Sequence, residues 1–279
     1  MSKGNGESDV LHPDTDENKS SSEQAEDELG LSSLTVYEII SLEGLEEMRR
    51  PLKSLWWSGV IAGLAISMSL YVMAALRITL PGEGKHILEN FGYAVGFLIV
   101  ILSRLQLFTE NTITPILPAL KSGRAAMGWQ VLRLWSVVFI ANLVGTFIAA
   151  AIPLVTPMFS TEHVDAMLEI SHHFADRPLN EVFFSAIPAG FLVAVMVWML
   201  PSSKRQEVWV ITIITFTIAI LDTSHVIVGS TEMFILMLHE GSGLTHAMPH
   251  ILTAGIGNII GGSVLFAVLA YAQVSKEIE

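Results

Sequence analysis

The sequence contains no cysteine, which excludes a disulfide framework and any thiolate metal site. Charge is also scarce beyond the first 48 residues: that segment has thirteen acidic side chains and two lysines, and therefore holds −11 of the net charge of −12. The remaining 231 residues are close to neutral and mostly apolar from Leu55 onward. The sequence therefore predicts a membrane protein that carries an acidic tail.

The tail is expected to remain disordered over residues 1–34, because its few apolar side chains cannot offset the loss of chain entropy on folding. Its acidic start differs from the basic stretch and apolar core of a secretory signal, so no cleavable signal peptide is expected. Residues 35–53 have roughly helical apolar spacing, which predicts an amphipathic juxtamembrane segment lying along the membrane surface.

The apolar runs predict six transmembrane segments within residues 54–274. A bilayer core about 30 Å thick needs roughly 20 apolar helical residues, and four runs meet this length: 54–76, 131–154, 181–200 and 251–272. Two further runs, 91–120 and 208–238, are interrupted by polar residues, which predicts that the second and fifth helices are broken. Backbone that leaves a helix at membrane depth must be buried in protein or line a polar cavity, so the two breaks indicate one central pathway.

Positive charges beside the spans predict the orientation of the chain. They gather in alternate loops: Arg49, Arg50 and Lys53; Lys121, Arg124 and Arg133; Lys204 and Arg205; and Lys276. Such loops face the cytoplasm in membrane proteins, so both termini are expected to be cytoplasmic.

The two halves of the membrane region resemble each other. Three stretches register, at offsets of 127, 122 and 116 residues: Trp57, Ser58, Ala62, Gly63 and Leu64 with Phe184, Ser185, Ala189, Gly190 and Phe191; Thr109 and Glu110 with Thr231 and Glu232; Ile140 and Asn142–Gly145 with Ile256 and Asn258–Gly261. Chance similarity between apolar helices is the alternative. Three spans per half is an odd number, so a true repeat must be inverted, with a site near the midplane between the broken helices.

At these positions the chain resembles the formate/nitrite transporter family, over roughly residues 50–274. The matching stretches are Leu107–Thr109, Asn142–Gly145, Phe191–Trp198, His225 and Gly257–Gly262. The resemblance implies an all-α, aquaporin-like fold of two inverted three-helix repeats, and a homopentamer with one pore per protomer. It also implies that a loop carrying Leu107, Phe108 and Thr109 faces a central pore histidine, His225, and that apolar constrictions fall near Tyr93, Phe97, Leu107 and Ile218.

The chain also departs from the family pattern at three positions. Where the family usually has a vestibule lysine and asparagines near the constrictions, this chain has Glu207, Gly190 and Gly229. It therefore resembles a divergent branch, similar to the uncharacterised bacterial inner-membrane members.

His225 is the leading candidate for a functional side chain. It follows the largely apolar run 208–221, and an imidazole there could donate a hydrogen bond or a proton to a small anion. A structural hydrogen bond to a neighbouring helix is the alternative. Thr109, at the start of the second half of its broken helix, either binds an anion through nearby donors or caps the helix. No second ligand has metal-binding spacing with His225, and no cofactor or phosphate motif is present, so neither a metal nor a cofactor is expected.

Arg104 is the most unusual charge in the sequence. It lies thirteen residues past Phe91, roughly 20 Å into the membrane at about 1.5 Å per residue. Since an unpaired charge there is costly, Arg104 is expected to pair with Glu110 or Glu232 in a buried charge network. Direct contact with an anionic substrate is the alternative. The two acids themselves are expected to lie in first helical turns, where they favour the helix dipole.

These features predict a channel or transporter for a small monovalent anion or its conjugate acid, in a bacterial inner membrane. A pore for a neutral or cationic solute and a non-conducting scaffold or sensor remain alternatives. An enzyme built on Arg104, His225, Glu110 and Glu232 is not expected, because catalytic motifs are missing. The expected partners are lipid, the small anion and further copies of the chain, with no nucleic acid.

Overall fold

Helices account for the apolar runs of the chain. The computed structural model describes residues 30–82 and 85–278 and contains no strand within them. Most of the expected tail, residues 1–29, lies outside the described residues. All elements discussed below belong to one unit that begins at Ser33.

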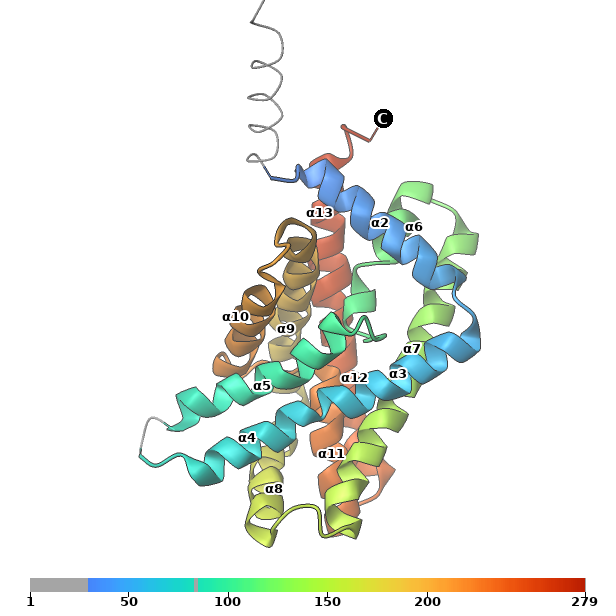
Figure 1. Cartoon of the computed structure of the whole chain (residues 1–279). Helices are drawn as coiled ribbons and strands as arrows, with labels where there is room; N and C mark the ends of the chain where they lie inside the picture. Colours follow the sequence, from blue (N-terminus) through green and yellow to red (C-terminus); the bar gives the residue numbers. More distant parts are fainter. Residues whose placement is uncertain (1–29, 83–84, 279) are drawn as a thin grey trace, which may run out of the picture. The chain divides into compact units, whose positions relative to one another are not determined.

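Within residues 30–82 and 85–278, five helical runs are long and apolar enough to cross a membrane, and each matches an expected span. Their elements are α3 (Leu52–Ile66) with α4 (Met68–Thr79); α5 (Lys85–Leu102); α7 (Ala125–Val155); α9 (Leu179–Met199) with η2 (Leu200–Ser202); and α12 (Leu244–Ile259) with η3 (Ile260–Ala267) and α13 (Val268–Val274). Figure 1 shows α12 and α13 as one continuous run.

The second and fifth spans are broken, as expected. The second consists of α5, an irregular segment, the short η1 (Glu110–Thr112) and α6 (Ile116–Ser122). The fifth consists of α10 (Glu207–Ile220), an extended turn and α11 (Val226–Glu240). The prediction of an all-α membrane fold with broken second and fifth helices is confirmed.

Two further helices lie outside this set. Helix α2 (Ser33–Arg49) falls on the expected amphipathic segment; its position at a membrane surface remains a prediction. Helix α8 (Thr161–Ala175) was not expected, because it lies between the predicted spans 131–154 and 181–200. The Ser160 side chain caps α8 by accepting a hydrogen bond from the His163 N–H, and α8 packs against α4 and α11.

Asn142 holds the first break in place. It is fully buried on α7, and its Nδ2 donates to the carbonyls of Gly59 (2.8 Å) and Gln106 (2.9 Å). Its Oδ1 accepts from the Phe108 N–H at 2.9 Å. One amide side chain thus satisfies two backbone groups of the broken segment, which lipid could not do.

Asn258 does the same for the second break. Its Nδ2 donates to the carbonyls of Ala186 (2.8 Å) and Ser224 (3.0 Å), and its Oδ1 accepts from the Val226 N–H at 2.9 Å. The packing repeats as well, because α3 packs on α7 and α9 packs on α12.

The two asparagine clamps establish the register of the repeat. They pair Gln106 with Ser224, and Phe108 with Val226, at an offset of 118 residues. The expected pairing of Thr109 with Thr231, at an offset of 122, is therefore wrong. The shared Thr-Glu dipeptide is a coincidence of sequence, since Thr231 lies within α11 and its Oγ1 is 2.8 Å from Ser67 Oγ.

The same register pairs Arg104 with Asp222. Both residues have a φ of 52°, the left-handed conformation that ends a helix. The following N–H groups then donate five residues back, from Leu105 to the Val100 carbonyl and from Thr223 to the Ile218 carbonyl. The two half-helices thus end with the same turn, which has Arg104 in the first repeat and Asp222 in the second.

Glycine allows the clamping helices to approach closely. A Cβ on Gly63 would meet the Asn142 carbonyl, and one on Gly190 would meet the backbone of Asn258. These two contacts are again equivalent in the repeat. They explain why Gly190 departs from the family pattern: an asparagine side chain has no space there.

Replacing Asn142 with alanine should destabilise the protein by about 2–3 kcal/mol, since three net hydrogen bonds of roughly 1 kcal/mol each are lost. Thermal unfolding of the detergent-solubilised protein measures this as a lowered Tm. Asn180→Ala, on the exposed first turn of α9, is the control and should leave Tm unchanged. Equal Tm values for native protein and Asn142→Ala would contradict the role of the clamp.

Candidate functional site

His225 lies where the fifth span is broken, and it is 2% exposed. It is the N-cap of α11, and its Nδ1 accepts a hydrogen bond from the Val228 N–H at 3.3 Å. Its Nε2 lies 2.8 Å from Thr109 Oγ1. Because Nδ1 acts as an acceptor, these contacts fit a neutral imidazole whose proton is on Nε2 and is donated to Thr109.

Thr109 brings the first break to the same point. Its side chain makes no capping hydrogen bond to η1, which removes the capping alternative, and its backbone carbonyl accepts from Thr112 Oγ1. If Nε2 donates to Oγ1, the Thr109 hydroxyl proton has no acceptor among the described residues and can be donated to a solute. The structure therefore brings together the threonine and histidine that the sequence singled out.

Apolar side chains surround this contact. The Phe97 ring meets the His225 ring edge-on at a centroid distance of 5.0 Å. Tyr93, Leu107 and Ile218 are buried in the same hydrophobic cluster. Phe108 belongs to this cluster too, but its ring packs on Phe139 and Trp135 of α7, with centroids 4.8 and 6.1 Å away.

The segment that carries Thr109 is also held by α2. Glu47 accepts hydrogen bonds from Gln106 Nε2 (3.1 Å) and Thr114 Oγ1 (2.6 Å), which lie on either side of Thr109 in the sequence. Burial raises the pKa of the Glu47 carboxyl, and these two hydrogen bonds oppose the rise. Helix α2 is thus attached to the site through one buried acid.

A vestibule of about 630 Å³ reaches His225 from the α8 side of the protein. Its polar lining includes both signs of charge: Arg77, His86, Glu89, Glu169, His173, Arg177, Asp222 and Glu232. Its lining also includes the buried residues His225, Val228 and Gly229 and the buried rings of Tyr93 and Phe174.

Both vestibule arginines are neutralised by carboxylates. Arg77 donates to Glu89 from Nε and Nη2, at 3.1 and 2.8 Å, and its Nη1 is 3.5 Å from Glu169. Arg177 Nη1 donates to the Asp222 carbonyl at 2.9 Å and lies 3.7 Å from the Asp222 carboxylate, which also contacts His173 at 3.0 Å.

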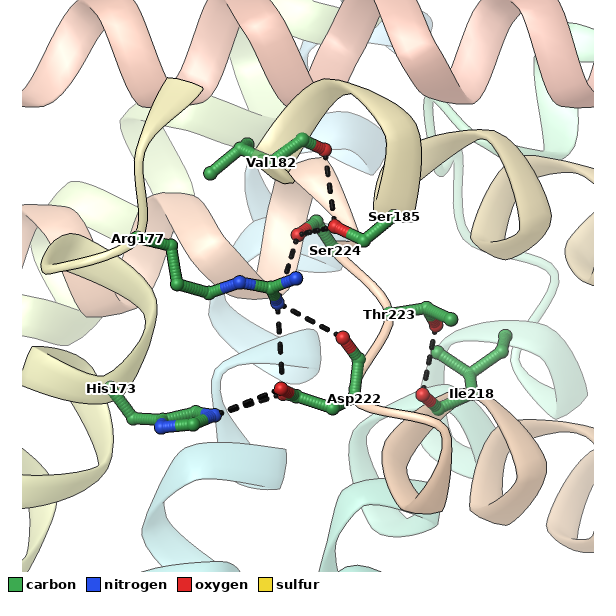
Figure 2. Close-up of polar contacts among 8 residues, drawn as sticks. All are labelled: His173, Arg177, Val182, Ser185, Ile218, Asp222, Thr223 and Ser224. Atoms are coloured by element: carbon green, nitrogen blue, oxygen red, sulfur yellow. Dashed lines mark hydrogen bonds and ion pairs between the residues drawn. The ribbon is translucent and has the colours of Figure 1, made fainter. Parts of the chain in front are cut away.

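Figure 2 shows how the second of these clusters joins separate elements. Arg177 and His173 approach Asp222 from the same side, and Arg177 also approaches Ser224, which contacts Ser185 on α9. The cluster therefore ties the end of α8 to the break next to His225.

The expected charge network of Arg104, Glu110 and Glu232 is wrong. Arg104 is exposed, and no ion pair among the described residues includes any of the three. Helix α5 ends at Leu102, the chain turns at Arg104 in the left-handed conformation, and the Arg104 side chain is exposed. The prediction that Arg104 lies about 20 Å into the membrane assumed that the helix continued. Arg104 instead acts on Glu43 of α2: burial raises the pKa of the Glu43 carboxyl, and the charge of Arg104 lowers it.

The expectation that both acids lie in first helical turns is confirmed for Glu110 and wrong for Glu232. Glu110 does begin η1, but η1 is only three residues long. Glu232 is the seventh residue of α11 and lines the vestibule, so it lies beyond the first helical turn.

The sequence did not identify Arg77, Glu89 and Arg177 as site residues. The available signal was the pairing of opposite charges near the ends of consecutive apolar runs, Arg77 with Glu89 and Arg177 with Asp222, which depends on α8 folding back over the break.

The remaining departures from the family pattern also have structural explanations. A Cβ on Gly229 would lie 2.9 Å from the Phe174 ring of α8, so a larger residue is excluded unless that ring moves. Glu207 lies in the first turn of α10, where an acid favours the helix dipole.

The sequence of the chain matches a known family and a known relative. A family model described as formate/nitrite transporter matches residues 34–272. The chain is 37% identical over 257 residues to the protein named inner membrane protein YfdC from Escherichia coli strain K12, covering 90% of this chain and 82% of that protein.

Two solved structures share the fold. One, named an FNT family ion channel, superposes with a TM-score of 0.75 at 16% sequence identity, over 85% of this chain and 98% of that one. The other is described as a pentameric formate channel with formate bound; it gives a TM-score of 0.67 at 18% identity, over 80% of this chain and 97% of that one.

Replacing Thr109 with valine keeps the shape of the side chain but leaves the buried His225 Nε2–H without its acceptor. The expected cost is about 1–3 kcal/mol of stability, measured as a lower Tm in detergent, and Thr109→Ser should restore it. Thr217→Val, at a half-buried position on α10, is the control. A Tm equal to that of the native protein would show that the histidine does not depend on Thr109.

Stability should also depend on pH through Glu47. Because its pKa is raised in the folded state, its contribution is fully present below the ordinary glutamate pKa and is lost as pH rises through the folded value. Tm should therefore fall more between about pH 5 and about pH 8 in the native protein than in Glu47→Gln, because this range begins just above the ordinary glutamate pKa. Glu38→Gln, on the exposed face of α2, should keep the native pH dependence.

Proposed function

Because the chain belongs to the formate/nitrite transporter family, we propose that it forms a transmembrane channel or transporter for a small monovalent anion or its conjugate acid. The observation that carries this proposal is the contact between Thr109 and His225, at 2.8 Å, where the two broken spans meet. His225 lines the vestibule, and its contact with Thr109 places a polar pair among buried apolar side chains.

The surrounding apolar layer decides which form of the solute crosses. A bare anion loses most of its hydration beside Phe97, Leu107 and Ile218, at a large free-energy cost. The Thr109 hydroxyl, whose proton is available when His225 Nε2–H donates to Oγ1, can compensate part of this cost at one point only. Passage as the neutral acid avoids most of the cost, so a proton is expected to cross together with the anion.

The chain would act as a homopentamer with one pore per protomer in a bacterial inner membrane. Large apolar side chains cover the outer faces of the spans, for example Trp129 (71% exposed) and Phe184 (67% exposed), which suits contact with lipid or with neighbouring protomers. In this proposal both termini are cytoplasmic, residues 54–274 form the pore domain, and residues 35–53 lie beside the membrane.

Uptake of labelled formate, nitrite and acetate into proteoliposomes tests the proposal. The native protein should give saturable uptake that rises as the external pH falls. His225→Ala should reduce uptake at least about ten-fold, corresponding to the loss of roughly 1.4 kcal/mol at the barrier. His239→Ala, an exposed histidine on the same helix, should behave as the native protein does.

Absence of uptake for all three anions at every pH, from protein shown to be folded, would rule out the formate-like function. Uptake of methylammonium or of urea in its place would identify a pore for a cationic or neutral solute. A folded pentamer that conducts none of these solutes would favour the scaffold or sensor alternative.

A further inference from the structure

Glu232 is the charged side chain of the vestibule that the site described so far does not use. It lies on one face of α11 with His225, Val228 and Gly229, at helical positions i, i+3, i+4 and i+7, and all four line the vestibule. The residue is 9% exposed, and its carboxyl makes no hydrogen bond or ion pair within the described part of the chain.

The arginines and the other carboxylates around Glu232 all have partners of opposite charge. The titratable and charged groups that face this space are Arg77 from α4; His86, Glu89 and Tyr93 from α5; Glu169 and His173 from α8; Arg177; Asp222 and His225 from the break; and, behind Arg177, His250 from α12. Arg77 is paired with Glu89 and Glu169, and Arg177 is paired with Asp222.

The consequence is a negative vestibule. Its two arginines and four carboxylates leave a formal charge of −2 when its histidines are neutral. An ionised Glu232 next to the path therefore opposes the entry of an anion. Protonation removes that repulsion and adds a hydrogen-bond donor.

We propose that Glu232 determines the charge form of the solute that this vestibule accepts: a monovalent anion enters only together with a proton, which Glu232 holds. The inference rests on the proposed function and specifies its substrate as a weak monovalent acid. Anion and proton binding are then linked, so each increases the affinity for the other. No bond of the solute has to break for this coupling.

The absence of cysteine allows the charge of Glu232 to be measured without any transport assay. A cysteine introduced by Asn90→Cys, on the vestibule wall, is the single thiol in the protein. Its modification rates with a positively and a negatively charged methanethiosulfonate reagent report the local potential. The native vestibule should favour the cationic reagent near neutral pH.

Adding Glu232→Gln should lower the cationic-to-anionic rate ratio by about ten-fold, the order expected for one unit charge nearby in partly hydrated protein. The difference between the two proteins should vanish at acidic pH, where native Glu232 is protonated. Glu240→Gln, a carboxylate on the same helix outside the vestibule, should keep the native ratio, and Glu232→Asp should keep the native pH dependence.

Two results would overturn the inference. If the ratio is the same with and without Glu232→Gln at every pH, Glu232 does not charge the vestibule. If the difference persists unchanged into acidic solution, Glu232 does not take up the proton. Both results are independent of whether the protein transports formate.

Formate uptake then tests the coupling itself. In the native protein uptake should increase about ten-fold for each unit of external acidification while Glu232 is mostly ionised, whereas Glu232→Gln should be several-fold less sensitive to pH. An unchanged pH profile in a folded Glu232→Gln variant would refute the coupling. Failure of the native protein to carry any anion would refute the proposed function instead, while the thiol measurement still decides the charge of Glu232.

Discussion

The fold depends on satisfying the backbone where two helices are broken inside an apolar environment. Asn142 and Asn258 do this with the same three hydrogen bonds each, two donated to carbonyls and one accepted from an N–H. Lipid offers no substitute for these partners. The glycines at 63 and 190 follow from this constraint, because the helices that carry the asparagines must approach closely to reach the breaks.

The same constraint positions the functional contact. Once the breaks are fixed, Leu107 and His225 occupy equivalent places in the two repeats, and only one of them is polar. The asymmetry lets His225 bond to Thr109 across the centre, while Leu107 contributes to the apolar layer around them. An inverted repeat therefore supplies the geometry, and the differences between its halves supply the chemistry.

The sequence predicted what depends on local composition, namely the spans and the two breaks. The contact between Thr109 and His225 was implied by the resemblance to the family. Prediction from the sequence failed where the direction of a side chain or the course of the chain mattered. Arg104 was counted along a helix that ends two residues earlier. Helix α8, whose buried face includes Met167 and Phe174, lies between the third and fourth spans and was not predicted. Thr231 was matched by residue type, although backbone contacts determine the register.

Charge compensation distinguishes structural from functional groups in the vestibule. Arg77 and Arg177 each have carboxylate partners, so their charges stabilise the folded chain and exert little field on a solute. Asp222 also ends the half-helix before His225, which explains its position without a role in transport. Glu232 is buried, but it has no cationic partner within the described residues and does not end a helix. Since burying a carboxyl without a partner is costly, we explain its presence by an interaction with the solute that passes through the vestibule.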